Sequence, residues 1–161
     1  MGEQMIAFRL PAISFGAASA IVTSMGMIIG FGAASISKPT IIAGLLIVGL
    51  ADNVTDSLSI HIYQESERLE QQAAFRATIG NFVTRLIISL SFVTLVFWFS
   101  TTNMLLACLI WGVLLLVALT WFVAKNRNAN VLTEVLKHLA VAAAVIAASL
   151  ATGTFISTYV Q

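Results

Sequence analysis

The sequence contains little charge, one cysteine and two prolines, and its low charge alone excludes most classes of soluble protein. Charged residues make up 9% of the 161 positions and hydrophobic residues 59%. A soluble domain usually has about 25% charged residues, so this chain cannot cover a water-facing surface, and we expect an integral membrane protein. Eight basic residues against seven acidic ones leave a net charge of +1. This balance excludes the basic surface that nucleic-acid binding requires.

Cysteine and the common catalytic patterns are scarce as well. The single cysteine, Cys108, lies inside the apolar run 105–119, so the chain can form neither a disulfide framework nor a cysteine-rich metal site. The sequence has no nucleophile–base pairing, phosphate-binding glycine loop or His/Glu metalloprotease spacing. We therefore expect neither an enzyme nor a bound cofactor.

Long stretches without charge predict five membrane spans. The run 86–124 has no charged residue, and as one helix it would be about 58 Å long, nearly twice the thickness of a bilayer core. It must therefore fold back, and the polar cluster 100–103 predicts the turn. With the other apolar runs, this gives a single all-α transmembrane domain over residues 1–161. Its approximate spans are 11–36, 40–63, 81–100, 103–124 and 136–159.

Two prolines and one polar stretch predict where helices begin and end. Proline is tolerated in the first turn of a helix, so Pro11 predicts the start of the first helix and Pro39 the start of the second. The polar stretch 64–76 is expected to connect the second helix to the third.

The basic residues predict the orientation in the bilayer. Of the eight Lys and Arg residues, Lys38 alone falls on one side of the five-span arrangement and the rest fall on the other. Loops rich in Lys and Arg stay in the cytoplasm, so we expect a cytoplasmic N-terminus and a C-terminus outside the cell or in a lumen. We expect the membrane to be the cell membrane of a prokaryote or the membrane of an organelle. Trp98, Trp121 and Tyr159 lie near span ends, as interfacial anchors do.

Asp52 and Asp56 are unusual because they lie inside the second predicted span. They share one helix face, which Glu67 and Glu70 continue toward the cytoplasm. A carboxylate at the bilayer centre costs about 2.5–3.5 kcal/mol, and two ionised carboxylates one turn apart repel each other. Such a pair is retained where a cation binds between them, where they share protons, or where a basic partner neutralises them. Arg85 is the basic residue near that depth, so an ion or proton pathway and a purely structural Asp–Arg pair are both open.

Small residues recur on the first and last predicted helices. Such stripes let helix backbones approach closely in lipid, either within one subunit or between two subunits. The stripes consist of Gly16, Ala20, Gly26, Gly30 and Ala34 on the first helix and of Ala140, Ala144, Ala148 and Thr152 on the last.

Several segments of the first two spans together resemble a known family. They are Phe15-Gly16-Ala-Ala-Ser19-Ala20, the small-residue stretch 26–32, Ala43-Gly44, and the segment from Asp52 to Ser66-Glu67. In these residues, and in its five-span layout, the chain is similar to the vacuolar iron transporters, which move Fe²⁺ and Mn²⁺ out of the cytosol. The resemblance implies a homodimer with an ion path between the first two helices of each subunit. The chain departs from the family at Ser19, where the family has an aspartate, and it lacks the family's cytoplasmic metal-binding domain.

We therefore predict a homodimeric carrier of divalent cations of the Fe²⁺/Mn²⁺ type, with or without proton coupling, that lies in the lipid bilayer and pairs through helices 1 and 2. Two other functions stay open. One is a non-transporting scaffold or accessory protein that kept the fold, and the other is a pathway for protons or monovalent cations. Met25 would add a soft sulfur ligand, although methionine more often serves packing. The candidate metal ligands are Asp52, Asp56, Glu67, Glu70, Ser19 and Met25.

Overall fold

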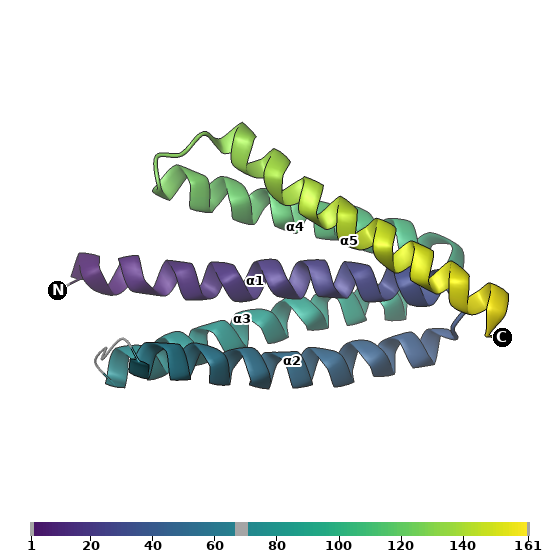
Figure 1. Ribbon diagram of the computed structural model, residues 1–161, viewed down its shortest axis with the longest axis horizontal. Coiled ribbons are helices and arrows are strands. Elements are labelled where there is room, and N and C mark those ends of the chain that lie inside the picture. Colours follow the sequence, from purple (N-terminus) through teal and green to yellow (C-terminus); the bar gives the residue numbers. More distant parts are fainter. Residues whose placement is uncertain (1, 67–70, 161) are drawn as a thin grey trace.

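The protein folds into five long helices that run back and forth along one axis (Figure 1). The computed structural model describes residues 2–66 and 71–160, with side chains at all of these positions except 2–13, 60, 64, 66, 71–74, 76, 77 and 102. The helices are α1 (Gly2–Ala33), α2 (Lys38–Ser66), α3 (Gln71–Trp98), α4 (Thr101–Asn126) and α5 (Val131–Tyr159).

Each helix contains a stretch long and apolar enough to cross a membrane, and the five stretches are Ser14–Ala33, Lys38–Tyr63, Thr78–Trp98, Asn103–Asn126 and Val131–Tyr159. The prediction of an all-α integral membrane protein with five membrane-spanning helices is therefore confirmed. Because the number of spans is odd, the two termini lie at opposite ends of the bundle (Figure 1). Which end faces the cytoplasm stays a prediction.

α1 occupies the centre of the bundle. It contacts each of the other four helices, with α2 and α3 on one side of it and α4 and α5 on the other (Figure 1). α1 is therefore the helix around which the other four pack.

Two predicted helix boundaries are wrong. α1 begins at Gly2, so Pro11 lies within the helix and does not open it. Proline removes one backbone hydrogen bond but does not prevent helix on its N-terminal side, where residues 3–8 include several good helix formers. α3 begins at Gln71, inside the stretch 64–76 that is expected to connect two helices, because Gln, Ala and Arg have good helix propensity and a helix satisfies its own backbone outside the membrane too.

The connections at Pro39 and at 100–103 lie close to their predicted places, whereas α5 begins five residues before its predicted span. α2 begins at Lys38, which places Pro39 in its first turn. The turn expected at 100–103 lies between Trp98 and Thr101, so its last residues already belong to α4. α5 begins after Asn130, whose side-chain oxygen accepts a hydrogen bond from the backbone N–H of Thr133 at 3.2 Å.

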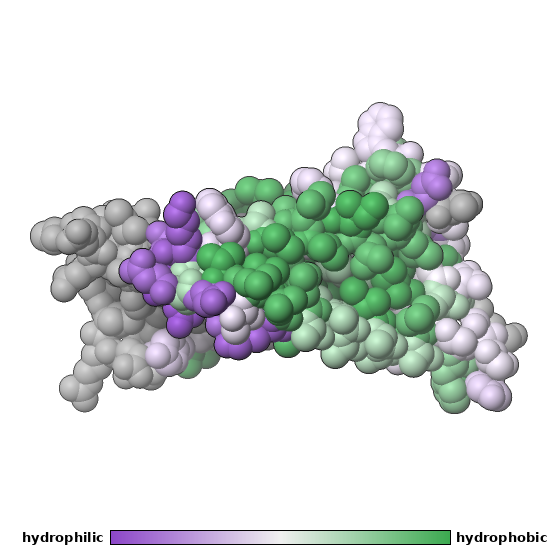
Figure 2. Space-filling view, turned by 90° about the horizontal axis from the view of Figure 1, so that it is seen from above, coloured by the Kyte–Doolittle hydropathy of each residue, from purple (hydrophilic) through white to green (hydrophobic). Residues whose placement is uncertain are grey.

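The surface has the layering that a bilayer requires. Figure 2 shows a broad hydrophobic belt between two more hydrophilic ends. Trp98 and Tyr159 are the last residues of α3 and α5, and both are exposed. Trp121 is exposed near the end of α4, where the ammonium of Lys125 lies 4.9 Å from the centre of its ring. These positions fit the predicted role of interfacial anchors.

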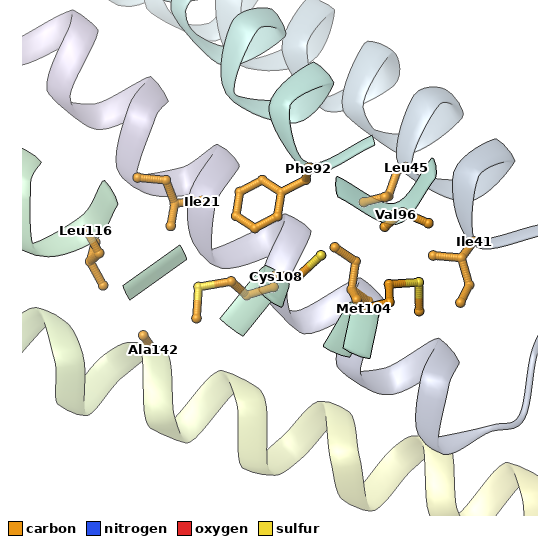
Figure 3. Close-up of a cluster of buried hydrophobic side chains, with 11 residues drawn as sticks. Ile21, Ile41, Leu45, Phe92, Val96, Met104, Cys108, Leu116 and Ala142 are labelled. Carbon is orange, nitrogen blue, oxygen red and sulfur yellow. The ribbon is translucent and has the colours of Figure 1, made fainter. Parts of the chain in front are cut away.

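The interior of the bundle is an apolar cluster that connects α1, α2, α3 and α4 and reaches Ala142 on α5. Phe92 of α3 is fully buried in it (Figure 3). The remaining members are Ile21, Met25, Ile28, Ile41, Leu45, Val96, Met104, Cys108, Leu116 and Ala142. Met25 therefore serves packing: its sulfur lies against Gly112 of α4, where a β-carbon would be only 2.2 Å away.

The small-residue stripe of α1 is used within the subunit. Gly26 and Gly30 of α1 pack against Ser149 of α5, and Gly153 packs against the backbone of Gly30. Gly16, at the other end of the α1 stripe, packs against α3. The α1 stripe thus packs within one chain, whereas the members of the α5 stripe, Ala140, Ala144, Ala148 and Thr152, are exposed, so the role of that stripe stays a prediction.

Candidate intramembrane ion site

Asp56 of α2 and Arg85 of α3 form an ion pair inside the membrane spans. The guanidinium Nη1 of Arg85 donates a hydrogen bond to Oδ2 of Asp56. Only 3% of the Arg85 side chain is exposed, against 27% of the Asp56 side chain. Of the three ways to keep a carboxylate at this depth, the basic partner is thus realised for Asp56. Arg85 accordingly lies inside the bundle and not among the surface charges that orient the helices.

Asp52 differs from Asp56. It lies one turn earlier on α2 and is half-buried, and its carboxylate forms no hydrogen bond or ion pair with any described residue. The nearby hydroxyl of Ser59 donates its hydrogen bond to the backbone carbonyl of Thr55 at 2.9 Å and not to Asp52. Arg85 thus pairs with one of the two acidic side chains, and the described residues offer no basic partner to the other.

Two buried asparagines adjoin the ion pair, and both are missing from the candidates that the sequence suggests. Asn53 of α2 donates from Nδ2 to the carbonyl of Phe82 on α3 at 2.9 Å. Asn81 of α3 is one turn from Arg85 and is completely buried. An asparagine in an apolar helix gives little signal by itself. The pairs Asn53 with Ser57 and Asn81 with Arg85, each one turn apart, are the pattern that could have indicated a polar helix contact.

α1 contributes a glycine to this region. A β-carbon at Gly16 would lie 1.9 Å from Oδ1 of Asn81 and 3.0 Å from Cγ of Arg85. The absence of a side chain at Gly16 therefore lets α3 bring its two polar residues directly against the α1 backbone. Ala17 and Ala20, also buried, keep the α1 surface small there.

The other predicted metal ligands are not brought together. Ser19 is half-buried on α1, and its hydroxyl has no hydrogen bond to a described residue. Met25 packs in the apolar cluster against α4, whereas Asp52 and Asp56 are on α2. Glu67 and Glu70 lie outside the described residues. Within the described part of the chain, no group of three or more His, Cys, Asp or Glu side chains could hold a metal ion.

Comparisons of the chain with protein-family models, with curated proteins and with solved structures gave no match in any of the three. The resemblance to the vacuolar iron transporters therefore stays a prediction, and the function has to be argued from the site itself. The protein is a multi-span helical membrane protein with an Asp–Arg pair inside its spans and a second aspartate one turn away that has no partner among the described residues.

Proposed function

We propose that the protein provides a membrane pathway for a proton or another monovalent cation, with Asp52, Asp56 and Arg85 as its charged site. The observation that supports this proposal is the charge balance of the site. Arg85 pairs with one of the two acidic side chains, so the other, Asp52, needs a proton or another cation to balance it when it is ionised. One monovalent cation balances that charge, and charge in a medium of low dielectric constant is costly unless it is balanced.

The unequal burial of the ion pair supports a moving ion. Asp56 is partly exposed whereas the guanidinium of Arg85 is buried, so a cation that enters from the surface of the bundle would meet the carboxylate first. A cation bound between Asp52 and Asp56 would compete with Arg85 for the same carboxylate. Binding of the cation and release of the ion pair are then coupled, which gives the two arrangements that a carrier needs.

Carriage of Fe²⁺ or Mn²⁺ is the second candidate, and the unpartnered carboxylate of Asp52 is the observation that favours it. Two points weigh against it. A divalent cation would leave one positive charge at the site while Arg85 remains there. In addition, such ions prefer about six ligands, and Asp52 and Asp56 offer few of them.

Proton uptake into reconstituted vesicles tests the proposal. The purified protein is placed in liposomes that contain a pH-sensitive dye, and a potassium gradient with valinomycin makes the interior negative. We expect the interior to acidify faster than in protein-free liposomes, or radioactive Na⁺ or Rb⁺ to enter separate liposomes that contain the protein and no valinomycin. Asp52→Asn and Asp56→Asn should each abolish the protein-dependent flux. Glu134→Gln is the matched control, because Glu134 pairs with Lys137 outside the site, and it should behave as the wild type.

Each alternative predicts a different result. A scaffold or accessory protein would give no flux of any monovalent cation, and that result would overturn the proposal. A divalent carrier would show Mn²⁺ entry that depends on Asp52, together with an increase in melting temperature on Mn²⁺ addition that Asp52→Asn abolishes. That pair of results, without monovalent flux, would replace the proposal with the second candidate.

A further inference from the structure

Four side chains in or beside the Asp56–Arg85 ion pair are almost completely buried. Each of them still has at least one polar atom without a partner among the described residues. We call Asn53, Ser57, Asn81 and Arg85 the buried polar cluster. Asn53 and Asn81 are 0% exposed, Arg85 3% and Ser57 7%. The unpartnered atoms are Oδ1 of Asn53, Oγ of Ser57, Oδ1 and Nδ2 of Asn81, and Nε of Arg85.

The cluster lies where α1, α2 and α3 meet. Asn53 and Ser57 are one turn apart on α2, and Asn81 and Arg85 are one turn apart on α3. α2 and α3 are held together here by the bond from Asn53 to the Phe82 carbonyl and by the Asp56–Arg85 ion pair. α1 closes the junction with Gly16, against which both Asn81 and Arg85 lie.

If these atoms had no hydrogen bonds, the loss of stability would exceed what the contact between two helices contributes. A buried polar atom without a hydrogen bond costs about 1–3 kcal/mol, and buried polar groups in proteins are almost always satisfied by the protein or by ordered water. Five such atoms in one cluster therefore indicate a bound species that supplies the missing hydrogen bonds.

The chemistry of the unpartnered atoms selects that species. Nε of Arg85 and Nδ2 of Asn81 are donors, whereas Oδ1 of Asn53 and Oδ1 of Asn81 are acceptors, and the hydroxyl of Ser57 can be either. A metal cation satisfies acceptors alone and is repelled by the guanidinium. An anion satisfies donors alone. Water donates and accepts, and a buried water typically makes about three hydrogen bonds to otherwise unsatisfied groups.

We propose that the buried polar cluster binds a chain of water molecules next to Asp56 and that the ion moved by the protein is the proton. This inference rests on the proposed function and specifies its ion. The hydrogen-bonded waters connect the partly exposed carboxylate of Asp56 to the interior of the bundle. A proton reaches Asp56 from outside the protein, protonates the carboxylate, and so releases Arg85 to bond to the cluster and its waters. A sodium or potassium ion would have to displace these waters without supplying the hydrogen bonds that Asn81 and Arg85 require.

The path ends at the apolar cluster. Beyond Arg85 toward the end of α3, the buried residues become Phe92 and Val96, and on α2 their counterparts are Leu45 and Ile41 (Figure 3). The structure thus joins a polar cluster on one side to a closely packed apolar layer on the other. In this arrangement the apolar layer closes the water chain on that side, so the proton held by Asp56 is released across the membrane only in the second arrangement, in which Arg85 no longer bonds to Asp56.

Asn81→Leu tests the inference, because leucine keeps the branching at Cγ and has no hydrogen-bonding atoms. In the liposome assay we expect wild-type protein to take up protons and neither radioactive Na⁺ nor Rb⁺, and to do so more slowly in D₂O than in H₂O. Asn81→Leu should abolish proton uptake, whereas Asn81→Ser, which keeps a hydroxyl and leaves room for water, should retain it. Asn103→Leu is the matched control, because Asn103 is exposed at the start of α4.

The outcomes separate this inference from the function on which it rests. Flux of Na⁺ or Rb⁺ without proton flux would overturn the proposal that the transported ion is the proton, but it would agree with the proposed pathway for a monovalent cation. Proton flux that Asn81→Leu leaves unchanged would overturn the water chain alone. Absence of any monovalent flux would overturn both. Should Asn81→Leu fail to elute as folded protein in detergent, the smaller change Ser57→Ala replaces it, and undiminished proton uptake in that variant would count against the inference.

Discussion

The carbonyl oxygen of Gly30 lies so close to Gly153 that a β-carbon at position 153 would be 2.2 Å from it. This contact joins α1 to α5 backbone against backbone, without a side chain between them. A β-carbon there would also lie 2.8 Å from Cβ of Ala33. Because neither neighbour is the flexible end of a long side chain, the helices themselves would have to separate.

Gly153→Ala is therefore expected to destabilise the protein by about 1–3 kcal/mol, the usual cost of overpacking a close contact. The measurement is the melting temperature of the purified protein in mild detergent. Ala151→Leu is the control, because position 151 is exposed on the same helix and has room for a larger side chain. Equal melting temperatures for Gly153→Ala and the wild type would show that α1 and α5 do not pack as closely as described.

The Asp56–Arg85 pair predicts unequal effects of removing its two partners. Asp56→Asn leaves a buried guanidinium without its counter-charge and should cost on the order of 3 kcal/mol. Arg85→Gln should cost less, because the carboxylate that it leaves behind is partly exposed. Denaturant titration in detergent measures both. The surface pair of Glu134 with Lys137 provides the comparison, and Lys137→Gln should change stability by at most about 0.5 kcal/mol. A larger loss in Arg85→Gln than in Asp56→Asn would contradict the burial on which the argument depends.

Lys38, at the start of α2, bonds to the end of α3 at the end of the bundle that holds the C-terminus. Its ammonium donates to the carbonyl oxygens of Phe97 and Phe99, each at 2.8 Å, at the end of α3. A cation at a helix C-terminus stabilises it by up to about 1 kcal/mol. Lys38→Met should therefore increase hydrogen–deuterium exchange around residues 97–100 and leave exchange at the α4–α5 connection unchanged. Lys125→Met, at the opposite end, should not affect residues 97–100.

A homodimer through helices 1 and 2 stays a prediction, and the structure narrows where its contact can lie. Ala20 of α1 is buried under other helices of the same chain, whereas Thr55 of α2 is exposed between Asp52 and Asp56. With Cys108 replaced by alanine, we expect Thr55→Cys to form a disulfide-linked dimer in membranes and Ala20→Cys to stay monomeric. Dimers from Ala20→Cys would show that α1 faces a second subunit. Monomers from both variants would remove the support for a dimer through these helices.

The number of helices follows from the sequence alone, because the cost of placing charge in a bilayer depends on composition and not on packing. The charge-free run 86–124 is too long for one span, and so it specifies two helices and a turn before any contact is known. The partner of Asp56 could be anticipated for a related reason. Arg85 is the basic residue near that depth, and a buried carboxylate requires compensation wherever the helices pack.

The tertiary structure alone decided which faces meet. Glycine and alanine pack closely against any neighbour in lipid, so the small-residue stripe of α1 could not indicate that Gly16 meets Asn81 while Gly30 meets Gly153. The buried polar cluster likewise depends on α2 and α3 presenting Asn53 and Asn81 to the same junction. An uncharged amide in a span does not specify which neighbour it faces, so only the packing of the three helices brings these side chains together. The helix boundaries at Gly2 and Gln71 differ from the membrane spans because a helix continues wherever its backbone is satisfied, whereas the span ends where the lipid does.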